Sequence, residues 1–312
     1  MSTSSSPAAD SPFEFAGSIA VVTGAGTGMG RELAVQLATS GADLALGDIH
    51  EDTLVETASL AAAANPDVRI VTHTCDVSDR AAVDAWRDAL AAELETDHVH
   101  LLFNNAGIGG GGSFVTDDAA GWERTFDICW GGVYNCARAF MPMLVAAPYA
   151  HIVNTSSVNG FWASIGPGRP HTAYSAAKFA VKGFTEALVT DLRANAPHVG
   201  ASVVMPGHIG TSIAMNSVKV HGGEVDAAVQ EVENAFRNTA PTTSAQAATI
   251  ILDGVRDRRW RILVGDDAVT LDELVRSTPE EAYELSFVER MLAEGALPGL
   301  VQTLADAAES DG

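Results

Sequence analysis

A tyrosine and a lysine stand four positions apart in the segment YSAAK, as Tyr174 and Lys178. On a helix, residues at i and i+4 lie on the same face. A tyrosine ordinarily titrates near pH ~10 and is a poor base at neutral pH. A neighbouring ammonium favours the phenolate and lowers that pKa, so the tyrosine becomes a usable acid/base. Because such pairs also occur on solvated helix faces, their meaning depends on the residues around them.

A serine and a glycine-rich turn accompany this pair. Ser157 ends an apolar stretch, seventeen residues before Tyr174. The first apolar burst of the chain is followed by TGAGTGMG, residues 23–30, and then by helical spacing. Small residues let the backbone approach a ligand, and a helix N-terminus favours a pyrophosphate through its free N–H groups and its dipole. The spacing T-G-x-x-x-G-x-G differs from the G-x-G-x-x-G fingerprint, so a plain tight turn is the alternative interpretation.

An acidic residue ends the second apolar strand, eighteen residues after Gly30. Asp48 can accept hydrogen bonds from both hydroxyls of an adenosine ribose, and its charge would repel a 2′-phosphate. No basic residue occurs in 24–30 or directly after Asp48, and Arg31 begins the following helix. The sequence therefore favours NAD over NADP, with an ordinary surface acid as the alternative.

Two further strand ends carry polar residues in the same order along the chain. Asp76 follows the third strand, where a carboxylate could cap the amino group of an adenine. The fourth strand ends in NNAG, where Asn105 and Gly107 can turn tightly beside a cofactor. Each is an ordinary turn residue by itself. Together with the glycine-rich turn and Asp48, they make four strand-end signals in series.

The elements that would position these residues alternate along the chain. Helical spacing covers 28–40, 51–63, 79–94, 119–146, 173–195 and 244–257, and apolar strands cover 19–24, 42–48, 68–76, 98–107, 150–157, 200–207 and 260–265. Continuous apolar strands are typical of a sheet covered on both faces. Strict alternation predicts a three-layer α/β, doubly wound Rossmann fold with a seven-stranded parallel sheet. In such sheets ligands bind beyond the carboxyl ends of the strands.

The chain divides into three parts. Residues 1–15, rich in serine, alanine and proline, predict a disordered N-terminal tail. Residues 16–265 are interpreted as a single catalytic domain, in which 208–243 is a substrate-side cap of loop and helix without a strand. Residues 266–312 are acidic and predict a helical C-terminal extension.

Composition excludes several function classes. The 312 residues include 40 acidic and 18 basic ones, and the net charge of −22 argues against a nucleic-acid-binding surface. No apolar run reaches the length of a membrane span, and the N-terminus lacks the features of a secretory signal. Cys75, Cys129 and Cys136 form no C-x-x-C pair, so neither a disulfide framework nor a metal site is expected. A reducing, cytoplasmic setting fits this cysteine usage.

Taken together, the motifs resemble those of the short-chain dehydrogenase/reductase family. The resemblance covers about residues 16–265 and rests on Thr23–Gly30, Asp76, Asn104–Gly107, Ser157, Tyr174, Lys178 and the segment PGHIGT at 206–211. It implies that Tyr174 exchanges a proton with the substrate oxygen and that Ser157 hydrogen-bonds that oxygen. It also implies that Lys178 holds the nicotinamide ribose and lowers the pKa of Tyr174.

The resemblance further implies a binding site for NAD(H), which carries the hydride. The residues assigned to this site are Gly24, Thr27, Gly28, Met29, Gly30, Asp48, Ile49, Asp76, Val77, Asn105, Ala106, Gly107, Thr155, Tyr174, Lys178, Pro206, Gly207, Ile209 and Thr211.

One position departs from the family. Its fourth catalytic member is an asparagine that follows a tryptophan in the long helix, and Trp122 with FDICWGG places Cys129 there. Asn135, six residues on, falls on a different helix face. In the family the asparagine holds a local opening of the helix and a water that relays protons to the lysine. A thiol is a weak donor and acceptor, so a rewired, wetter or weaker relay is expected. Gly131 and Gly132 predict a loosened helix or close contact with a neighbouring subunit.

The predicted substrate pocket has mainly apolar walls. Its candidate residues are Ser157, Asn159, Phe161, Trp162, His208 and Ile213. His171 and His208 are interpreted as wall or hydrogen-bonding residues, and Arg169 is the one arginine near the pocket. These walls predict a small apolar secondary alcohol or ketone as substrate. A steroid, a polyol or a cyclic diol is the alternative within the same chemistry.

Two broader expectations complete the prediction. Members of the family commonly pair the two long helices, here 119–146 and 173–195, across a two-fold interface, so a homodimer or homotetramer is expected. An alternative of another class is a low-turnover NAD(H)-binding sensor or scaffold, because Cys129 replaces the family's asparagine.

Overall fold

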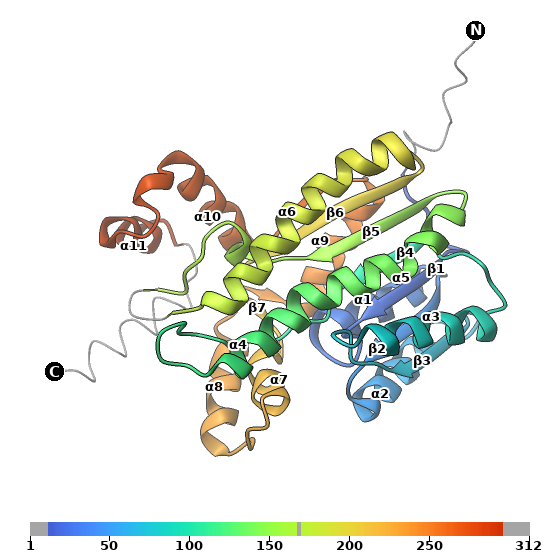
Figure 1. Cartoon of the computed structure of the whole chain (residues 1–312), viewed down its shortest axis with the longest axis horizontal. Helices are drawn as coiled ribbons and strands as arrows, with labels where there is room; N and C mark the ends of the chain where they lie inside the picture. The colour runs from blue at the N-terminus through green and yellow to red at the C-terminus, as the bar shows by residue number, and fades with distance from the viewer. Residues whose placement is uncertain (1–11, 167–169, 296–312) are drawn as a thin grey trace, which may run out of the picture.

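A computed structural model describes residues 12–166 and 170–295, and it places a central sheet between two layers of helices (Figure 1). All seven strands of the sheet run parallel, in the order β3-β2-β1-β4-β5-β6-β9. Their bounds are β1 Ile19–Thr23, β2 Asp43–Asp48, β3 Ile70–Thr74, β4 Leu101–Asn104, β5 Ala150–Thr155, β6 Val199–Pro206 and β9 Arg261–Val264. The predicted doubly wound α/β fold with a seven-stranded parallel sheet is confirmed.

Helices cover both faces of the sheet because its strands are apolar on both. β1, β4 and β5 are buried along their whole length. One core cluster joins a face of the sheet to α1 (Gly28–Thr39), α2 (Glu51–Ala64) and α9 (Ser244–Arg256). A second joins the other face to α3 (Arg80–Glu93), α5 (Gly132–Ala146) and α6 (Thr172–Asn195). In Figure 1, α5 and α6 cross in front of the sheet.

The long helix predicted over 119–146 is interrupted. α4 (Ala119–Phe126) is followed by a π-helical turn, Asp127–Gly131, before α5 begins. A Cβ added to Gly132 would lie 2.6 Å from the Val77 side chain. This glycine is therefore needed for a close approach within the chain, while the π turn supplies the loosened helix that the paired glycines predicted.

The amino-terminal boundary differs from the prediction. Phe13 and Phe15, assigned above to the disordered tail, are buried at 1% and 3% exposure. The Phe13 N–H donates to the Arg256 carbonyl at 2.8 Å, and its ring packs edge-on against Tyr149 at 5.2 Å. Both aromatic rings are buried in the core cluster that contains α1, α2 and α9, and this burial anchors the segment. Residues 1–11 lie outside the described residues.

The cap over 208–243 contains two short strands that the sequence did not predict. β7 (Ile209–Gly210) pairs in parallel with β8 (Thr242–Thr243). α7 (Ile213–Val220) and α8 (Ala227–Asn238) lie between them. A two-residue strand is too short to show a periodic pattern in the sequence. The pairing forms because the fold brings the two ends of the cap together.

The C-terminal segment is helical as far as it is described. α10 (Asp266–Ser277), a 3₁₀ turn (Pro279–Glu281) and α11 (Leu285–Ala293) form a third core cluster with residues that follow β5. Among the described residues, no helix is long and apolar enough to cross a membrane.

Candidate active site

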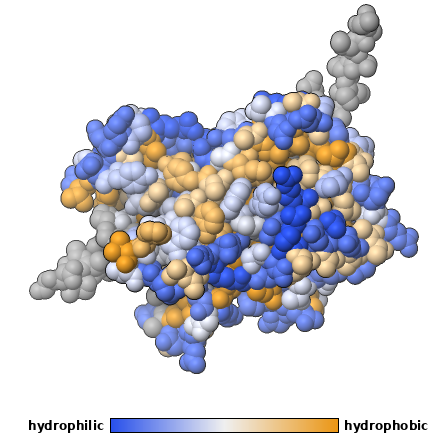
Figure 2. Space-filling view, viewed as in Figure 1, coloured by the Kyte–Doolittle hydropathy of each residue, from blue (hydrophilic) through white to orange (hydrophobic). Residues whose placement is uncertain are grey.

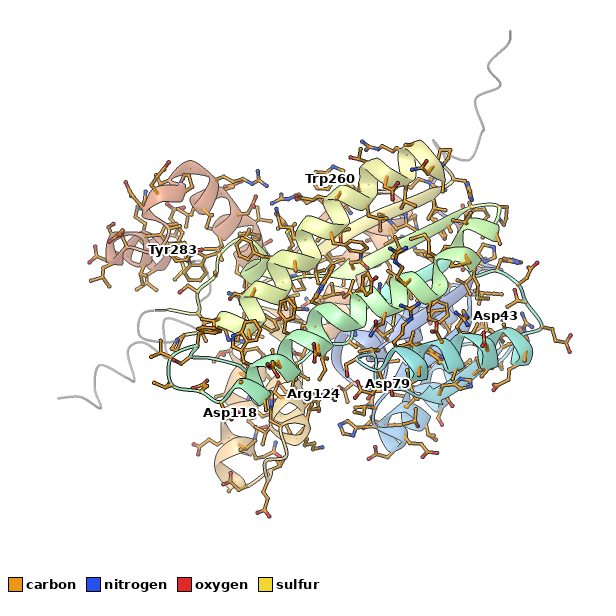
Figure 3. All side chains as sticks on the ribbon, viewed as in Figure 1. Asp43, Asp79, Asp118, Arg124, Trp260 and Tyr283 are labelled. Atoms are coloured by element: carbon orange, nitrogen blue, oxygen red, sulfur yellow. The ribbon has the colours of Figure 1, made fainter. Side chains whose placement is uncertain are left out.

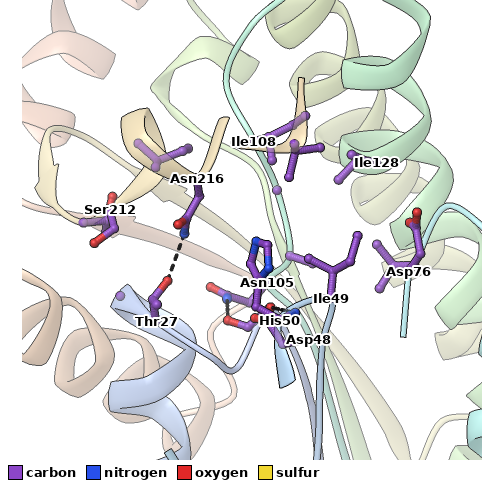
Figure 4. A pocket seen from close by; sticks show the side chains of 18 of the residues that line it. Thr27, Asp48, Ile49, His50, Asp76, Asn105, Ile108, Ile128, Ser212 and Asn216 are labelled. Carbon is purple, nitrogen blue, oxygen red and sulfur yellow. Dashed lines mark hydrogen bonds between the residues drawn. The ribbon is translucent and has the colours of Figure 1, made fainter. Parts of the chain in front are cut away.

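The carboxyl ends of the strands open onto two adjoining cavities. The smaller, of about 140 Å³, lies over the glycine-rich turn and the ends of β2 and β4 (Figure 4). The larger, of about 410 Å³, lies beside β5, β6 and α6. The cavities share the lining residues Met29, Asn105, Gly107, Thr211 and Ile213. A long ligand can therefore extend from one into the other.

The serine, tyrosine and lysine identified from the sequence all line the larger cavity. Ser157 follows β5 and is 8% exposed, and its Oγ accepts a hydrogen bond from the Asn159 N–H at 3.1 Å. Lys178 is 3% exposed, and its Nζ donates to the Thr155 carbonyl at 2.9 Å. The same Nζ lies 5.3 Å from the centre of the Tyr174 ring. The fold thus joins a buried hydroxyl, a partly buried phenol and a buried ammonium at one site.

Burial governs the titration of this site. It raises the pKa of the Tyr174 phenol, Cys129 acts in the same direction, and a hydrogen bond with Ser157 opposes both. Burial lowers the pKa of the Lys178 ammonium, while Cys129 favours its charged form. Lys178 is not among the groups that shift the Tyr174 pKa in this structure, so the lowering by its ammonium stays a prediction. Burial by itself favours the protonated phenol.

Cys129 lies next to Lys178 without touching the cavity. It belongs to the π turn, is fully buried, and its Sγ donates to the Ile108 carbonyl at 3.2 Å. A Cβ added to Gly107 would lie 3.4 Å from the Lys178 Nζ and 3.7 Å from the Cys129 Sγ. Asn135 donates to the carbonyls of residues 77 and 78, far along the helix from this place. The thiol, rather than this asparagine, therefore occupies the position beside the lysine.

The glycine-rich turn has the geometry of an anion site. Gly24 and Gly28 have positive φ angles of 63° and 56°. Thr27, the N-cap of α1, makes no side-chain capping bond, so the first amides of the helix are open to a ligand. A Cβ on Gly30 would overlap the Gly24 carbonyl. Glycine is therefore needed at this position for packing within the turn, and Gly30 does not line the cavity. The residues present fit a pyrophosphate.

Asp48 is held at the end of β2 by two backbone amides. Its carboxylate accepts hydrogen bonds from the Gly26 N–H at 2.8 Å and the His50 N–H at 3.0 Å. Arg31 donates to the Gly26 carbonyl and pairs with Glu56 at 2.6 Å. Asp48 lines the smaller cavity, and its negative charge is not neutralised by this arginine.

Asp76 has a partner that the sequence did not identify. Arg124 of α4 bonds its carboxylate at 2.7 Å and also donates to the Ser78 hydroxyl at 2.6 Å. Burial works in the opposite direction, but the hydrogen bonds from Ser78 and Arg124 lower the pKa of Asp76. Arg124 also lines the smaller cavity. An arginine two residues after Trp122 was visible in the sequence, but its reach to the end of β3 was not.

Helix α7 closes over the smaller cavity. The Asn216 side chain donates to the Thr27 hydroxyl at 3.0 Å, which Figure 4 shows as a bridge across the opening. The Ser217 hydroxyl accepts from the Gly109 N–H at 2.7 Å. Neither residue was predicted, because both bonds join segments more than one hundred residues apart.

The predicted substrate residues separate into two groups. Asn159, His208 and Ile213 line the larger cavity, as do Ser164 and Phe236, which were not singled out from the sequence. Trp162 does not line it: its ring is 1% exposed, and its Nε1 donates to the Ala282 carbonyl at 2.7 Å. Phe161 is also absent from the lining and packs with the C-terminal helices. Arg169 lies outside the described residues.

Two histidines border the larger cavity in the neutral state. The His171 ring lies 4.7 Å from the Tyr174 ring, and burial lowers its pKa to about 4. The His208 Nε2 donates to the Phe236 carbonyl at 2.7 Å, and burial lowers its pKa. Neither histidine is therefore placed to provide a positive charge at neutral pH.

The other predicted cofactor residues line one or the other of the two cavities. Gly24, Thr27, Gly28, Ile49, Val77 and Ala106 line the smaller cavity, and Thr155, Pro206, Gly207 and Ile209 line the larger one.

Comparison with known proteins agrees with this geometry. The oxidoreductase SadH of Mycobacterium tuberculosis is 38% identical over 262 residues, which cover 84% of this chain and 91% of SadH. A solved short-chain dehydrogenase/reductase of Burkholderia phymatum in complex with NAD is 33% identical, with a TM-score of 0.75 over 86% of this chain and 96% of that one. Carveol dehydrogenase of Mycobacterium avium, solved with NAD, is 27% identical, with a TM-score of 0.65 over 80% and 97%.

A more distant solved short-chain oxidoreductase of metagenomic origin, 24% identical with a TM-score of 0.61 over 81% and 98% of the two chains, carries NADP. The family model described as short chain dehydrogenase matches residues 18–221. The chain therefore belongs to the short-chain dehydrogenase/reductase family.

Proposed function

We propose that this oxidoreductase transfers a hydride between NAD(H) and an apolar secondary alcohol or ketone. The observation that most supports the proposal is the convergence of Ser157, Tyr174 and Lys178 on one cavity that adjoins the glycine-rich turn. When bound, the cofactor supplies the hydride chemistry and, in its oxidised form, a positive charge.

The residues of the larger cavity have distinct tasks in this proposal. In the reductive direction the Tyr174 phenol donates its proton to the carbonyl oxygen of the substrate, and in the oxidative direction it takes that proton back. Ser157 hydrogen-bonds the same oxygen, and this bond strengthens as negative charge develops there. Lys178 binds the ribose of the cofactor, and its ammonium with the positive nicotinamide opposes the burial that keeps the phenol protonated.

The preference for NAD over NADP is a separate proposal. It is supported by Asp48, whose carboxylate is fixed in the smaller cavity by the amides of Gly26 and His50. A 2′-phosphate placed there would meet a fixed negative charge, whereas ribose hydroxyls would meet acceptors.

The apolar substrate class is supported by the walls of the larger cavity. Val158, Ile165, Ile209, Ile213 and Phe236 line it, and the two neighbouring histidines are neutral. Such walls favour an uncharged apolar molecule with one oxygen to react. The similarity to carveol dehydrogenase makes a cyclic secondary alcohol a reasonable first member of the panel.

The deciding experiment measures NAD- and NADP-linked turnover of a panel of secondary alcohols and ketones, steroids, polyols and cyclic diols. Wild-type turnover that Tyr174→Phe lowers by roughly 100-fold or more supports the proposed chemistry. Tyr134→Phe, the same substitution on α5, serves as the control. NADH binding without turnover of any panel member would instead support a sensor or scaffold, an alternative favoured only by the presence of Cys129.

We also propose that the protein is a homodimer or homotetramer. α5 and α6 expose the side chains of Tyr134, Val145 and Phe179 at 40–43%. Figure 2 shows apolar and hydrophilic residues interleaved on the face where α5 and α6 lie in Figure 1. Sedimentation velocity should show more than one chain per particle, and Phe179→Glu should shift it toward the monomer.

A further inference from the structure

The C-terminal helices contact both walls of the larger cavity, although they lie beyond the region that the family model matches. On one wall, two successive N–H groups donate to the last residue of β9 and to the first turn of α10. The Gly207 N–H bonds the Val264 carbonyl at 3.0 Å, and the His208 N–H bonds the Asp267 Oδ2 at 2.7 Å. Gly207 and His208 line the cavity, whereas Asp267 does not line it and contacts the wall through the His208 N–H.

Asp267 is a buried acid in the first turn of α10. It is 5% exposed, and among the described residues it forms no ion pair and its Oδ1 has no hydrogen-bond partner. A buried carboxylate without a cation is costly, and the free N–H groups at the start of a helix offset part of that cost. Burial raises the pKa of Asp267, and the backbone N–H groups of His208 and Ala268 oppose this shift. The His208 N–H is the contact that joins this acid to the cavity wall.

The backbone around Asp267 is shaped to admit the carboxylate. A Cβ on Gly207 would overlap it, and so would a Cβ on Gly265. Gly265 also has a positive φ of 99°, a conformation that side-chain-bearing residues rarely adopt. Both glycines are thus explained by the close approach of one carboxylate to the cavity wall.

A second wall of the larger cavity contacts the same C-terminal segment. The Trp162 Nε1 donates to the Ala282 carbonyl at 2.7 Å, and the Ala163 N–H donates to the Tyr283 hydroxyl at 3.0 Å. Figure 3 shows Tyr283 on the side of the C-terminal helices that faces the loop after β5. Val158, next to the catalytic Ser157, lines the cavity and packs in the same core cluster as Trp162 and Phe287.

We propose that the C-terminal helices position both walls of the active site, with Asp267 as the positioning residue of the Gly207–His208 wall and Trp162 as that of the substrate wall. The inference rests on the proposed function, in which the Gly207–His208 wall contacts the nicotinamide and the other wall contacts the substrate.

The first test compares Asp267→Ala, Asp267→Asn and the control Asp266→Asn, which removes the same charge from an exposed neighbour. Asparagine retains an acceptor for the His208 N–H, whereas alanine leaves that donor without one. We expect the Kd for NADH, followed by its fluorescence, to rise roughly 10-fold in Asp267→Ala and to stay near the wild-type value in the other two. Wild-type affinity in Asp267→Ala, or equal weakening in Asp267→Asn, would overturn the positioning role.

A second measurement does not depend on the cofactor. Hydrogen exchange of the amides at 207–209 should be faster in full-length Asp267→Ala than in Asp266→Asn, even if the wild-type protein turned over no substrate. Absence of turnover would thus contradict the proposed function, and unchanged exchange would contradict this inference.

The substrate wall is tested by Trp162→Phe, with the exposed Trp260→Phe as the control. Loss of the indole N–H should raise the KM for secondary alcohols roughly 5-fold while leaving the Kd for NADH unchanged. This test also applies if Asp267→Ala does not fold. An unchanged KM in Trp162→Phe would overturn the role of the C-terminal helices at this wall.

Discussion

At the residue scale, the main departure from the family is the thiol beside the active-site ammonium. Cys129 retains a hydrogen bond to the Ile108 carbonyl, and the π turn is present without the asparagine that the family carries there. A single weak donor is therefore compatible with this local backbone. What changes is the polarity of the site next to Lys178, because sulfur binds water less well than an amide does.

Replacing this thiol tests its part in proton transfer. Cys129→Asn should give a folded, active enzyme whose kcat changes by roughly 5-fold and whose pH profile shifts, because one stronger hydrogen bond is worth about 1 kcal/mol. The measurement is kcat against pH for wild type, Cys129→Asn and Cys129→Ala. Identical profiles for wild type and Cys129→Asn would reduce the thiol to a packing residue.

The proposed preference for NAD also rests on a single residue. Asp48→Ala removes the fixed charge in the smaller cavity, so the ratio of kcat/KM with NAD to that with NADP should fall by roughly 10-fold or more. Asp52→Ala, a nearby exposed acid on α2, is the control. A wild-type enzyme with the higher kcat/KM for NADP would show that Asp48 was misinterpreted.

At the scale of elements, the helix that carries Cys129 is positioned by its glycines. Gly132 faces Val77 at the end of β3, and this close approach sets how near the π turn lies to the cavity. The paired glycines thus have separate explanations: Gly131 ends the π turn, and Gly132 allows the contact.

A larger side chain at this contact should lower the free energy of unfolding. Gly132→Ala places a Cβ 2.6 Å from Val77, and overpacking of this kind costs about 1–3 kcal/mol. Urea unfolding should show that loss, whereas Gly183→Ala, on α6 with open space around the added Cβ, should show none or a small gain. Equal stability of Gly132→Ala and wild type would mean that α5 shifts freely away from β3.

At the scale of the whole molecule, a buried histidine links stability to pH. His151, on β5, donates from Nε2 to the Ser202 hydroxyl at 2.7 Å, and that hydroxyl donates to the Arg259 carbonyl at 2.6 Å. Its Nδ1 has no hydrogen-bond partner among the described residues. Burial, with a smaller effect of the Arg258 charge, lowers the pKa of His151 to about 3.

This pKa predicts acid sensitivity. Above pH ~6.5 the histidine is neutral in both states, but between about 6.5 and 3 the unfolded chain binds a proton that the folded chain excludes. Stability should therefore fall with decreasing pH by up to about 1.4 kcal/mol per unit. His151→Gln should flatten the dependence of the urea-unfolding free energy on pH between 7.5 and 5 relative to wild type. Parallel pH slopes in the two proteins would contradict the assignment.

The sequence alone determined the alternation of apolar strands and amphipathic helices, and with it the parallel sheet. It also determined the order of the chemical groups at the strand ends, because these depend on local spacing. Tyr174 and Lys178 share a helix face whatever surrounds them. For the same reason, Ser157 and the glycine-rich turn could be assigned to the carboxyl edge of the sheet before any contact was known.

Only the tertiary structure decided which side chains complete the site. Arg124 reaches Asp76, Asn216 reaches Thr27, and Asp267 reaches His208 across 48, 189 and 59 residues of chain. Trp162 stands among the pocket candidates in sequence but turns toward Ala282, 120 residues away, because its indole N–H must find an acceptor when buried. Such pairings depend on the packing of distant elements, and local spacing carries no information about them.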